Sequence, residues 1–256
     1  MPFVTSIRKQ YDNPATNHHK NNAFEVTGGD IIYTAGGYKI HMFTTVGDHE
    51  LKIMPNKDLN SSAMHLTKDG LDFEYLVIGG GAGGGSRHGG GGGAGGMVTS
   101  TNSSLGIGNY STSVAAGGTG IQGDQRGNSG GNSTFHTVTA NGGGGGGSWA
   151  NNSPGNPGGS GGGATNSNNF SIGAKTQADF APLNGEGFGN PGGSSAVWGN
   201  QISHLREGGG GGAGGRGLDG NEAEQPGRGN TGLGGPGRAN SITGTSLFWA
   251  GGGGGA

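Results

Sequence analysis

The 256-residue sequence contains no cysteine, so it can form neither a disulfide framework nor a thiolate site. Charged residues make up only 12% of the chain, and the formal net charge is −2. A nearly neutral chain lacks the basic surface with which proteins bind nucleic acid or anionic membranes. We therefore expect no nucleic-acid partner.

Long apolar runs and helical periodicity are also missing. No stretch of roughly 18 apolar residues could span a membrane, and residues 1–10 lack the apolar core of a secretory signal. No segment repeats its apolar residues with the spacing of an α-helix. These absences predict a protein made in a cytoplasm, without membrane insertion and without significant α-helix.

Glycine is what the chain has in abundance. It contains 68 glycines and 9 prolines, together about 30% of its residues, a composition that usually indicates low complexity or disorder. Disordered chains normally combine low hydrophobicity with high charge, and high charge is missing here. A disordered spacer remains the alternative to a compact fold.

The glycines are gathered in runs that repeat. The octapeptide at 89–96 recurs letter for letter at 208–215, its first six residues recur at 251–256, and six glycines occupy 142–147. The first run follows an apolar segment, residues 73–78, that reads as a β-strand. A repeat without a fixed period indicates one architectural element used several times.

The first run also imitates a dinucleotide-binding motif. Gly79, Gly81 and Gly84 follow a strand and satisfy G-x-G-x-x-G. A dinucleotide site needs a helix after the motif and an acidic residue about twenty positions later. More glycines follow instead, and the region near Met97 to Ser104 is Ser, Thr and Asn. We therefore predict no bound cofactor.

Runs of glycine have no side chains to bury, so the backbone itself must hold them together. Extended three-fold helices of the polyproline II type make no internal hydrogen bonds, and side-by-side packing would pair their N–H and C=O groups. We expect a layered bundle of polyglycine II helices joined by surface loops. Valine at Gly91 or Gly144 should prevent folding, whereas Ala82, Ala94 and Ala213 mark places where a methyl is tolerated or faces outward.

The fold class expected is therefore all-β and irregular, with three parts. Residues 1–29 form an N-terminal arm that would dock to a larger assembly, and residues 30–78 form a small β module of short strands separated by turn signals. Residues 79–256 form the glycine-rich polyglycine II domain, with long polar loops such as 164–207.

Catalysis has little support in the sequence. The eight histidines show no metal-ligand spacing, and the sixteen carboxylates are scattered. Asp219, Glu222 and Glu224 share one glycine-rich loop, and a carboxylate pair could serve a glycan-cleaving protein. Without a scaffold to fix their separation, we predict no catalytic residue, no metal site and no enzyme.

Aromatic and asparagine side chains outside the runs are the best candidates for recognition. Aromatic faces stack on the apolar faces of sugars, and Asn amides bind hydroxyls. The candidate receptor contacts are Trp198, Phe188, Trp149, Asn151 and Asn152. Trp149 and Trp249 adjoin glycine runs, so they also fit a structural role as caps on the bundle, which leaves Trp198 as the foremost contact.

Several segments resemble a known family. The run after Leu76-Val77-Ile78, the segment Arg87-His88 with its following glycines, and Ser241 to Thr245 before the last run are similar to the glycine-rich domain of phage tail and virion proteins, notably of cyanobacterial viruses. Residues 36–43 resemble the β segment that precedes this domain. The resemblance covers about residues 25–256, although such domains commonly continue past the last run to a closing strand.

The resemblance implies a non-enzymatic virion component. Polyglycine sandwiches occur in adhesins at phage tail-fibre tips, where the loops contact the host. The expected partners are other tail or baseplate proteins through the N-terminal region, a host-surface glycan or outer-membrane protein, and further copies in a homo-oligomer such as a trimer. The expected location is the virion, after assembly in the host cytoplasm.

Two other functions stay open. One is a purely structural virion part, such as a spacer or a head decoration. The other is an extracellular glycine-rich structural or ice-binding protein, which would need an export route. The missing signal sequence favours the virion.

Overall fold

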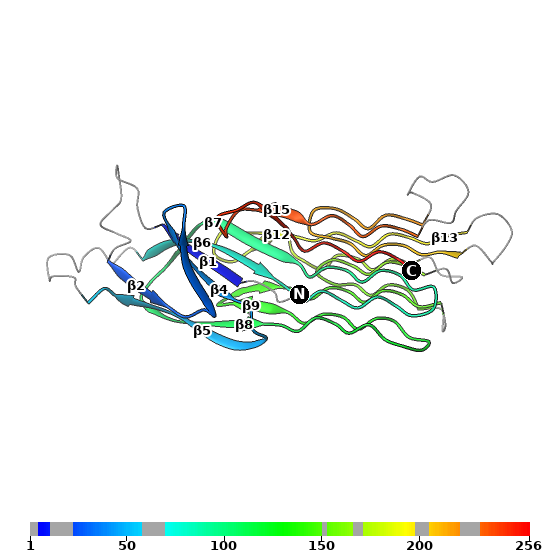
Figure 1. Ribbon diagram of the computed structural model, residues 1–256, viewed down its shortest axis with the longest axis horizontal. Coiled ribbons are helices and arrows are strands. Elements are labelled where there is room, and N and C mark those ends of the chain that lie inside the picture. The colour runs from blue at the N-terminus through cyan, green and yellow to red at the C-terminus, as the bar shows by residue number, and fades with distance from the viewer. Residues whose placement is uncertain are drawn as a thin grey trace.

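The computed structural model describes residues 5–10, 23–57, 70–149, 153–165, 171–197, 205–220 and 231–256. Within these ranges the chain is all-β and contains no α-helix, as the sequence predicts. No helix in this part of the chain is long and apolar enough to cross a membrane. The molecule is elongated, with a two-sheet sandwich at one end and a bundle of extended threads at the other (Figure 1).

Two antiparallel sheets form the sandwich. The larger sheet has the order β11 (Phe180–Ala181), β12 (Gly185–Phe188), β7 (Met97–Leu105), β6 (Leu71–Ile78), β1 (Thr5–Gln10), β4 (Tyr38–Phe43) and β3 (Ile31–Ala35). The smaller sheet has the order β10 (Val138–Ala140), β9 (Ser133–Phe135), β8 (Gly108–Val114), β5 (Gly47–Pro55) and β2 (Phe24–Thr27).

Two small hairpins complete the strand list. They are β13 (Ala196–Val197) with β14 (Leu205–Arg206), and β15 (Arg238–Asn240) with β16 (Leu247–Trp249). Each of the two large sheets contains strands that precede residue 78 in the sequence and strands that follow it. Strands β1 and β2 come from residues 1–29. The expected arm, β module and glycine-rich domain are therefore joined by shared sheets.

Strand β6 connects the two ends of the molecule because both faces of its second half, residues 75–78, are buried. Phe73, Tyr75 and Val77 point into the core between the sheets, where Phe135 of β9 meets the rings of Phe73 and Tyr75. Leu76, on the other face, joins a second cluster whose other buried members are Ile78, Met97, Ala213 and Ile242. Alternate residues of a strand face opposite sides, so β6 anchors both clusters.

The threads beyond β6 have the hydrogen-bond spacing of three-fold helices. Residues three apart in the first run donate to residues three apart in the second run. The bonds run from the N–H groups of Gly79, Ala82 and Gly85 to the carbonyls of Gly96, Gly93 and Gly90, at 2.9–3.0 Å. The intervening N–H groups of Gly80 and Gly83 bond to a different thread, at Gly131 and Asn128.

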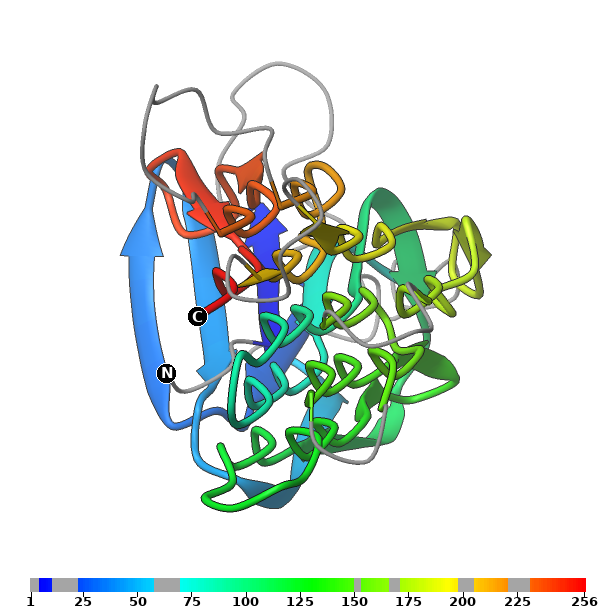
Figure 2. The ribbon, with the colours of Figure 1, turned by 90° about the vertical axis from the view of Figure 1, so that its right-hand side faces the viewer.

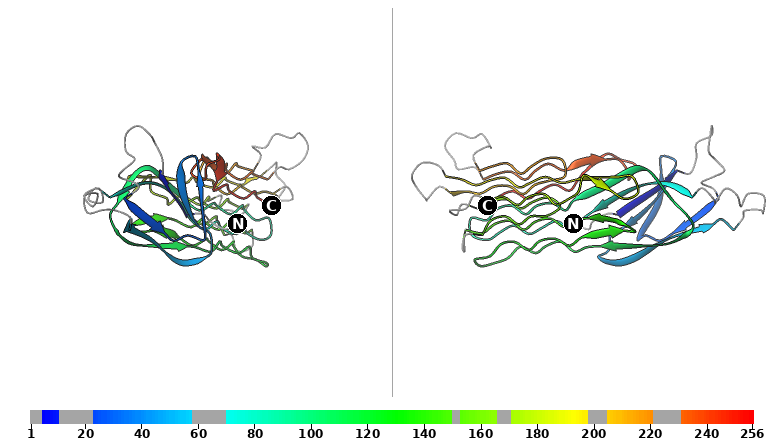
Figure 3. Two further views of the ribbon diagram at one scale, coloured as in Figure 1. Left: turned by 60° about the vertical axis from the view of Figure 1, so that its left-hand side comes forward. Right: turned by 180° about the vertical axis from the view of Figure 1, so that it is seen from behind.

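This pattern is that of polyglycine II. A helix with three residues per turn presents every third N–H in one direction, and no described glycine inside the runs has a positive φ. Neighbouring threads run antiparallel, as above, or parallel, as where Gly91 and Ala94 donate to Gly208 and Gly211. Figure 2 looks along the threads and shows them as open coils packed side by side, and Figure 3 shows them leaving the sandwich strands.

The close packing explains why the runs are glycine. A Cβ atom at Gly91 would overlap the carbonyl oxygen of Gly253, and one at Gly144 would overlap that of Asn156, both far inside contact distance. Alanine also occurs inside the bundle: Ala94 and Ala213 are buried, and Ala82 is half-buried. The methyls at Ala94 and Ala213 are thus accommodated inside and do not face outward.

Candidate functional site

The structure separates the predicted contact residues that it describes. Trp149 lies at the far end of the bundle, where its backbone N–H donates to the backbone carbonyl of Arg87 at 3.3 Å. Phe188 lies in β12 and pairs with Met97, at the sandwich end of the run 89–96. At about 3.1 Å per residue, that run separates the two ends by roughly 25 Å. Trp198, Asn151 and Asn152 lie outside the described residues.

The Phe188 side chain is packed against other residues of the protein. It packs against the second cluster, and the Arg238 guanidinium carbon lies 3.7 Å above its ring centroid, a cation–π contact. Trp249, expected as a cap, also packs against the second cluster and donates its Nε1–H to the Asn240 carbonyl at 3.3 Å. Both aromatic residues secure the junction between sandwich and bundle.

The far end of the bundle is built around the turn Ser86–Arg87–His88, which joins the first two glycine runs. We call this turn, together with Asp124, Trp149 and Glu207, the distal site. Arg87 and His88 have φ angles of 47° and 49°, in the left-handed region that side chains with a Cβ disfavour. In a chain with 68 glycines, this turn keeps two large side chains where glycine would fit with less strain.

Arg87 is held in place on an exposed surface. Its guanidinium makes a two-point contact with Asp124, Nε to Oδ1 at 3.0 Å and Nη1 to Oδ2 at 3.3 Å. Ser86 reinforces the same junction by donating its hydroxyl to the Gln125 carbonyl at 3.0 Å. The Arg87 side chain is 62% exposed, and the neighbouring Trp149 is 46% exposed. An oriented cation and an open aromatic ring thus share this end.

His88 covers a buried carboxylate. The Glu207 side chain is only 1% exposed, and its Oε1 lies 3.3 Å from His88 Nδ1. Burial raises the pKa of Glu207, although its own backbone N–H and His88 oppose that rise. The backbone of His88 is fixed as well, because the Thr165 hydroxyl donates to its carbonyl at 2.6 Å.

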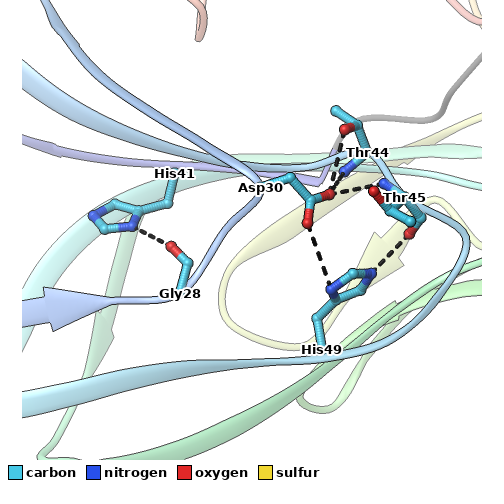
Figure 4. A network of polar contacts seen from close by, with 6 residues as sticks. All are labelled: Gly28, Asp30, His41, Thr44, Thr45 and His49. Atoms are coloured by element: carbon cyan, nitrogen blue, oxygen red, sulfur yellow. Dashed lines mark hydrogen bonds and ion pairs between the residues drawn. The ribbon is translucent and has the colours of Figure 1, made fainter.

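A second polar cluster lies at the sandwich end, around Asp30 and His49 (Figure 4). Asp30 Oδ2 accepts the N–H groups of Thr44 and Thr45 at 2.6 and 2.8 Å. Burial by itself would raise the pKa of Asp30, but these hydrogen bonds outweigh it and hold the pKa below its ordinary value.

Both ring nitrogens of His49 face protein groups. Nε2 lies 2.7 Å from the Thr45 carbonyl oxygen, and Nδ1 lies 3.8 Å from Asp30 Oδ1. In the same region His41 Nδ1 lies 2.7 Å from the Gly28 carbonyl. The cluster braces the turn after β4. In the described ranges, no group of three or more His, Cys, Asp or Glu is arranged to hold a metal ion.

Sequence reasoning missed most of the distal site. Arg87, His88 and Glu207 were not among the predicted contacts, although His88 and Glu207 directly precede glycine runs and Arg87 lies in the three-residue turn between two of them. A charged or ionisable residue at the end of a side-chain-free run is the signal that could have indicated them.

Comparison with known proteins identifies one family. A family model described as a glycine-rich domain matches residues 59–256. No curated protein and no solved structure gives a significant match.

Proposed function

This chain belongs to the glycine-rich domain family, and on that premise we propose that it is a non-enzymatic phage attachment protein. It is a tail-fibre or tail-tip component of the virion whose distal site contacts a glycan or an outer-membrane protein on the host surface. The sandwich end, which contains β1 and β2 of the N-terminal region, joins it to tail or baseplate proteins.

The observation that carries this proposal is the left-handed conformation of Arg87 and His88. Strained backbone with large side chains tends to persist where the side chains have a function. Elsewhere in the bundle the close approach of threads selects glycine. At the distal turn the chain accepts strain and retains two side chains that reach solvent.

The chemistry of the distal site suits a sugar. A half-exposed Trp149 offers an apolar ring face for stacking. The Arg87 guanidinium has five N–H donors in a fixed plane, and its contact with Asp124 orients the plane without burying it. The backbone bundle beneath holds both groups without large moving parts, so little ordering is needed on binding.

Binding to host material tests the proposal. We expect Trp149→Ala and Arg87→Ala to weaken binding of the labelled protein to outer-membrane vesicles of a susceptible strain at least tenfold. Phe180→Ala is the matched control, because Phe180 is 85% exposed but lies in β11 of the sandwich. Its binding should equal that of wild type.

A result in which both distal variants bind as wild type would refute the distal site as the contact surface. The structural alternative, a spacer or head decoration, is favoured by the extensive bonding between threads. Immunogold labelling of the particle distinguishes the two, because a spacer or head protein would not label the tail tip.

A further inference from the structure

The turn that joins the first two glycine runs leaves most of its backbone N–H groups open. The N–H groups of Arg87, His88 and Gly89 bond to no acceptor in the described part of the chain. Only the N–H of Ser86 is used, and it donates to a carbonyl of a neighbouring turn at 3.2 Å. Arg87 and His88 are exposed. Three consecutive amide donors at the far end of the bundle therefore lack a partner.

The carbonyl groups of the same turn are all occupied. Each of them accepts a hydrogen bond from a residue outside the turn. The donors are the Ser148 hydroxyl to Ser86 at 2.9 Å, the Trp149 backbone N–H to Arg87 at 3.3 Å, and the Thr165 hydroxyl to His88 at 2.6 Å. The protein thus fixes the turn through its acceptors and leaves the donors unused.

A second turn of the same kind shows what is unusual here. Leu183 and Asn184, between β11 and β12, have φ angles of 57° and 55°, the same left-handed pair. There the N–H of Gly185 closes the turn by donating to the Pro182 carbonyl at 3.3 Å. The equivalent N–H in the distal turn, that of Gly89, makes no such bond. The distal turn is therefore open where the sandwich turn is closed.

The left-handed conformation brings the open donors together. Two successive residues of this kind point neighbouring N–H groups to one side, as the first turn of an α-helix does in mirror image. Successive N–H groups held in this way in a turn form a concave binding site for anions. The φ angles of Arg87 and His88, 47° and 49°, create this arrangement.

The Arg87 side chain adds charged donors to the turn. A guanidinium has five N–H groups, and two of them, on Nε and Nη1, contact Asp124, which leaves three. The nearby carboxyl groups already face partners, because Asp124 faces Arg87 and the buried Glu207 lies 3.3 Å from His88 Nδ1. The polar groups that remain unpaired at the surface of the turn are therefore donors.

We propose that the distal turn binds the phosphate group of a phosphorylated sugar, an assignment of ligand class that rests on the proposed function of the distal site. The three amide and three guanidinium N–H groups exceed the roughly four acceptor positions of a carboxylate. A phosphate monoester has three strong acceptor oxygens and pairs with Arg in a two-point contact. The half-exposed ring of Trp149, whose backbone bonds to that of Arg87, is the stacking surface for the sugar.

Amide resonances of the isotope-labelled full chain test the site directly. On titration with inorganic phosphate at constant ionic strength, the amide protons of Arg87, His88 and Gly89 should shift downfield on one saturation curve, because a hydrogen bond to an anion deshields the proton. Sodium chloride at the same ionic strength should leave them in place. Unshifted resonances, or saturable shifts only elsewhere in the chain, would overturn the assignment.

Arg87→Gly separates the side chain from the turn, because glycine adopts a positive φ without strain. Loss of the charged two-point contact should weaken phosphate binding roughly tenfold. Arg216→Gly is the matched control: Arg216 is 46% exposed and contacts Asp219 at 3.0 Å, but it lies outside the left-handed turn. The control should bind phosphate as wild type does. An equal loss in both variants, or no loss in Arg87→Gly, would contradict the proposed site.

A sugar phosphate tests the role of the aromatic ring. Glucose 1-phosphate should bind wild type several times more tightly than inorganic phosphate does, because Trp149 stacks on the sugar. Trp149→Ala should remove this difference while keeping the affinity for inorganic phosphate. Equal affinities of wild type for the two probes would overturn the assignment to a sugar phosphate.

Phosphatase treatment of the outer-membrane vesicles distinguishes this assignment from the proposed function. The enzyme removes phosphate monoesters from glycans but leaves phospholipid diesters, and treated vesicles should lose their binding of wild type. Undiminished binding to treated vesicles would refute the phosphate assignment and leave attachment standing. Shifts with phosphate but no binding to untreated vesicles would support the anion site and refute attachment.

Discussion

The two ends of this molecule are held together by different parts of the chain. In the sandwich, side chains such as Tyr75 and Phe135 are fully buried between two sheets, and removal of apolar surface from water provides the stabilisation. In the bundle, the buried atoms are mostly main-chain atoms, and lateral N–H···O bonds replace the apolar core. Backbone hydrogen bonding therefore plays in one half the role that side-chain packing plays in the other.

The comparison also shows where each half is sensitive to substitution. A sandwich core tolerates apolar exchanges of similar volume because side chains repack. At most of the buried glycines of the bundle, the atoms nearest to an added Cβ are backbone atoms, and backbone cannot repack. The same addition of two or three carbon atoms should thus have very different effects in the two regions.

The largest effect is expected for Gly144→Val. The new Cβ would overlap the Asn156 carbonyl, so the threads must separate and lose the bonds that Gly144 and its neighbours make. The loss should exceed the 4–5 kcal/mol at which single substitutions become exceptional, and Gly91→Val should behave alike. Thermal unfolding by circular dichroism measures it, with Gly120→Val as the tolerated control. A Gly144→Val protein as stable as wild type would rule out the packed bundle.

Phe135→Ala should have the next largest effect. Phe135 is fully buried and meets the rings of Phe73 and Tyr75, so truncation should lower the free energy of unfolding by about 3–5 kcal/mol. Denaturant titration measures this loss. Because β6 belongs to both clusters, we expect one transition for the whole molecule. Two separate transitions would show that the halves unfold independently and that β6 does not couple them.

The smallest effect is expected for Glu207→Gln in the bundle. The raised pKa of Glu207 means that the folded protein binds a proton at this carboxylate more tightly than the unfolded chain does. The stability of the wild-type protein should therefore fall as the pH rises from about 4.3, the usual pKa of glutamate, through the higher pKa of the folded state. The variant should lack this decline and unfold a few degrees higher at neutral pH. Thermal melts from pH 4 to pH 7 give the comparison, and parallel curves for the two proteins would contradict it.

Much of the fold could be predicted from the sequence because its local signals are strong. The apolar segment at 73–78 does lie in strand β6, the module of short strands expected at 30–78 contains β3 to β6, and the absence of helical periodicity matches the all-β structure. The three-residue hydrogen-bond spacing is the one expected of polyglycine II helices packed side by side. The segment 164–207, expected to be loop, contains the short strands β11 to β14.

Arrangement was harder to predict than local structure. β1 lies between β4 and β6, and nothing in its sequence TSIRKQ specifies that place. Likewise, glycine runs that are identical in sequence carry no side chains to select their neighbours. The distal site depends on this lateral order, because Arg87, Trp149 and Glu207 come together only once the threads are placed. Aromatic content alone directed the prediction to Phe188, which is part of the junction.

The three-residue spacing of the bonds also constrains how the chain can change in length during evolution. Deleting one glycine from a buried run would rotate all later residues of that run by a third of a turn, so that each N–H would point to the wrong thread. Deleting three would preserve the phase and shorten the thread by about 9 Å. Among relatives, insertions and deletions in buried runs should therefore occur in multiples of three, while the turns between them vary without such a rule.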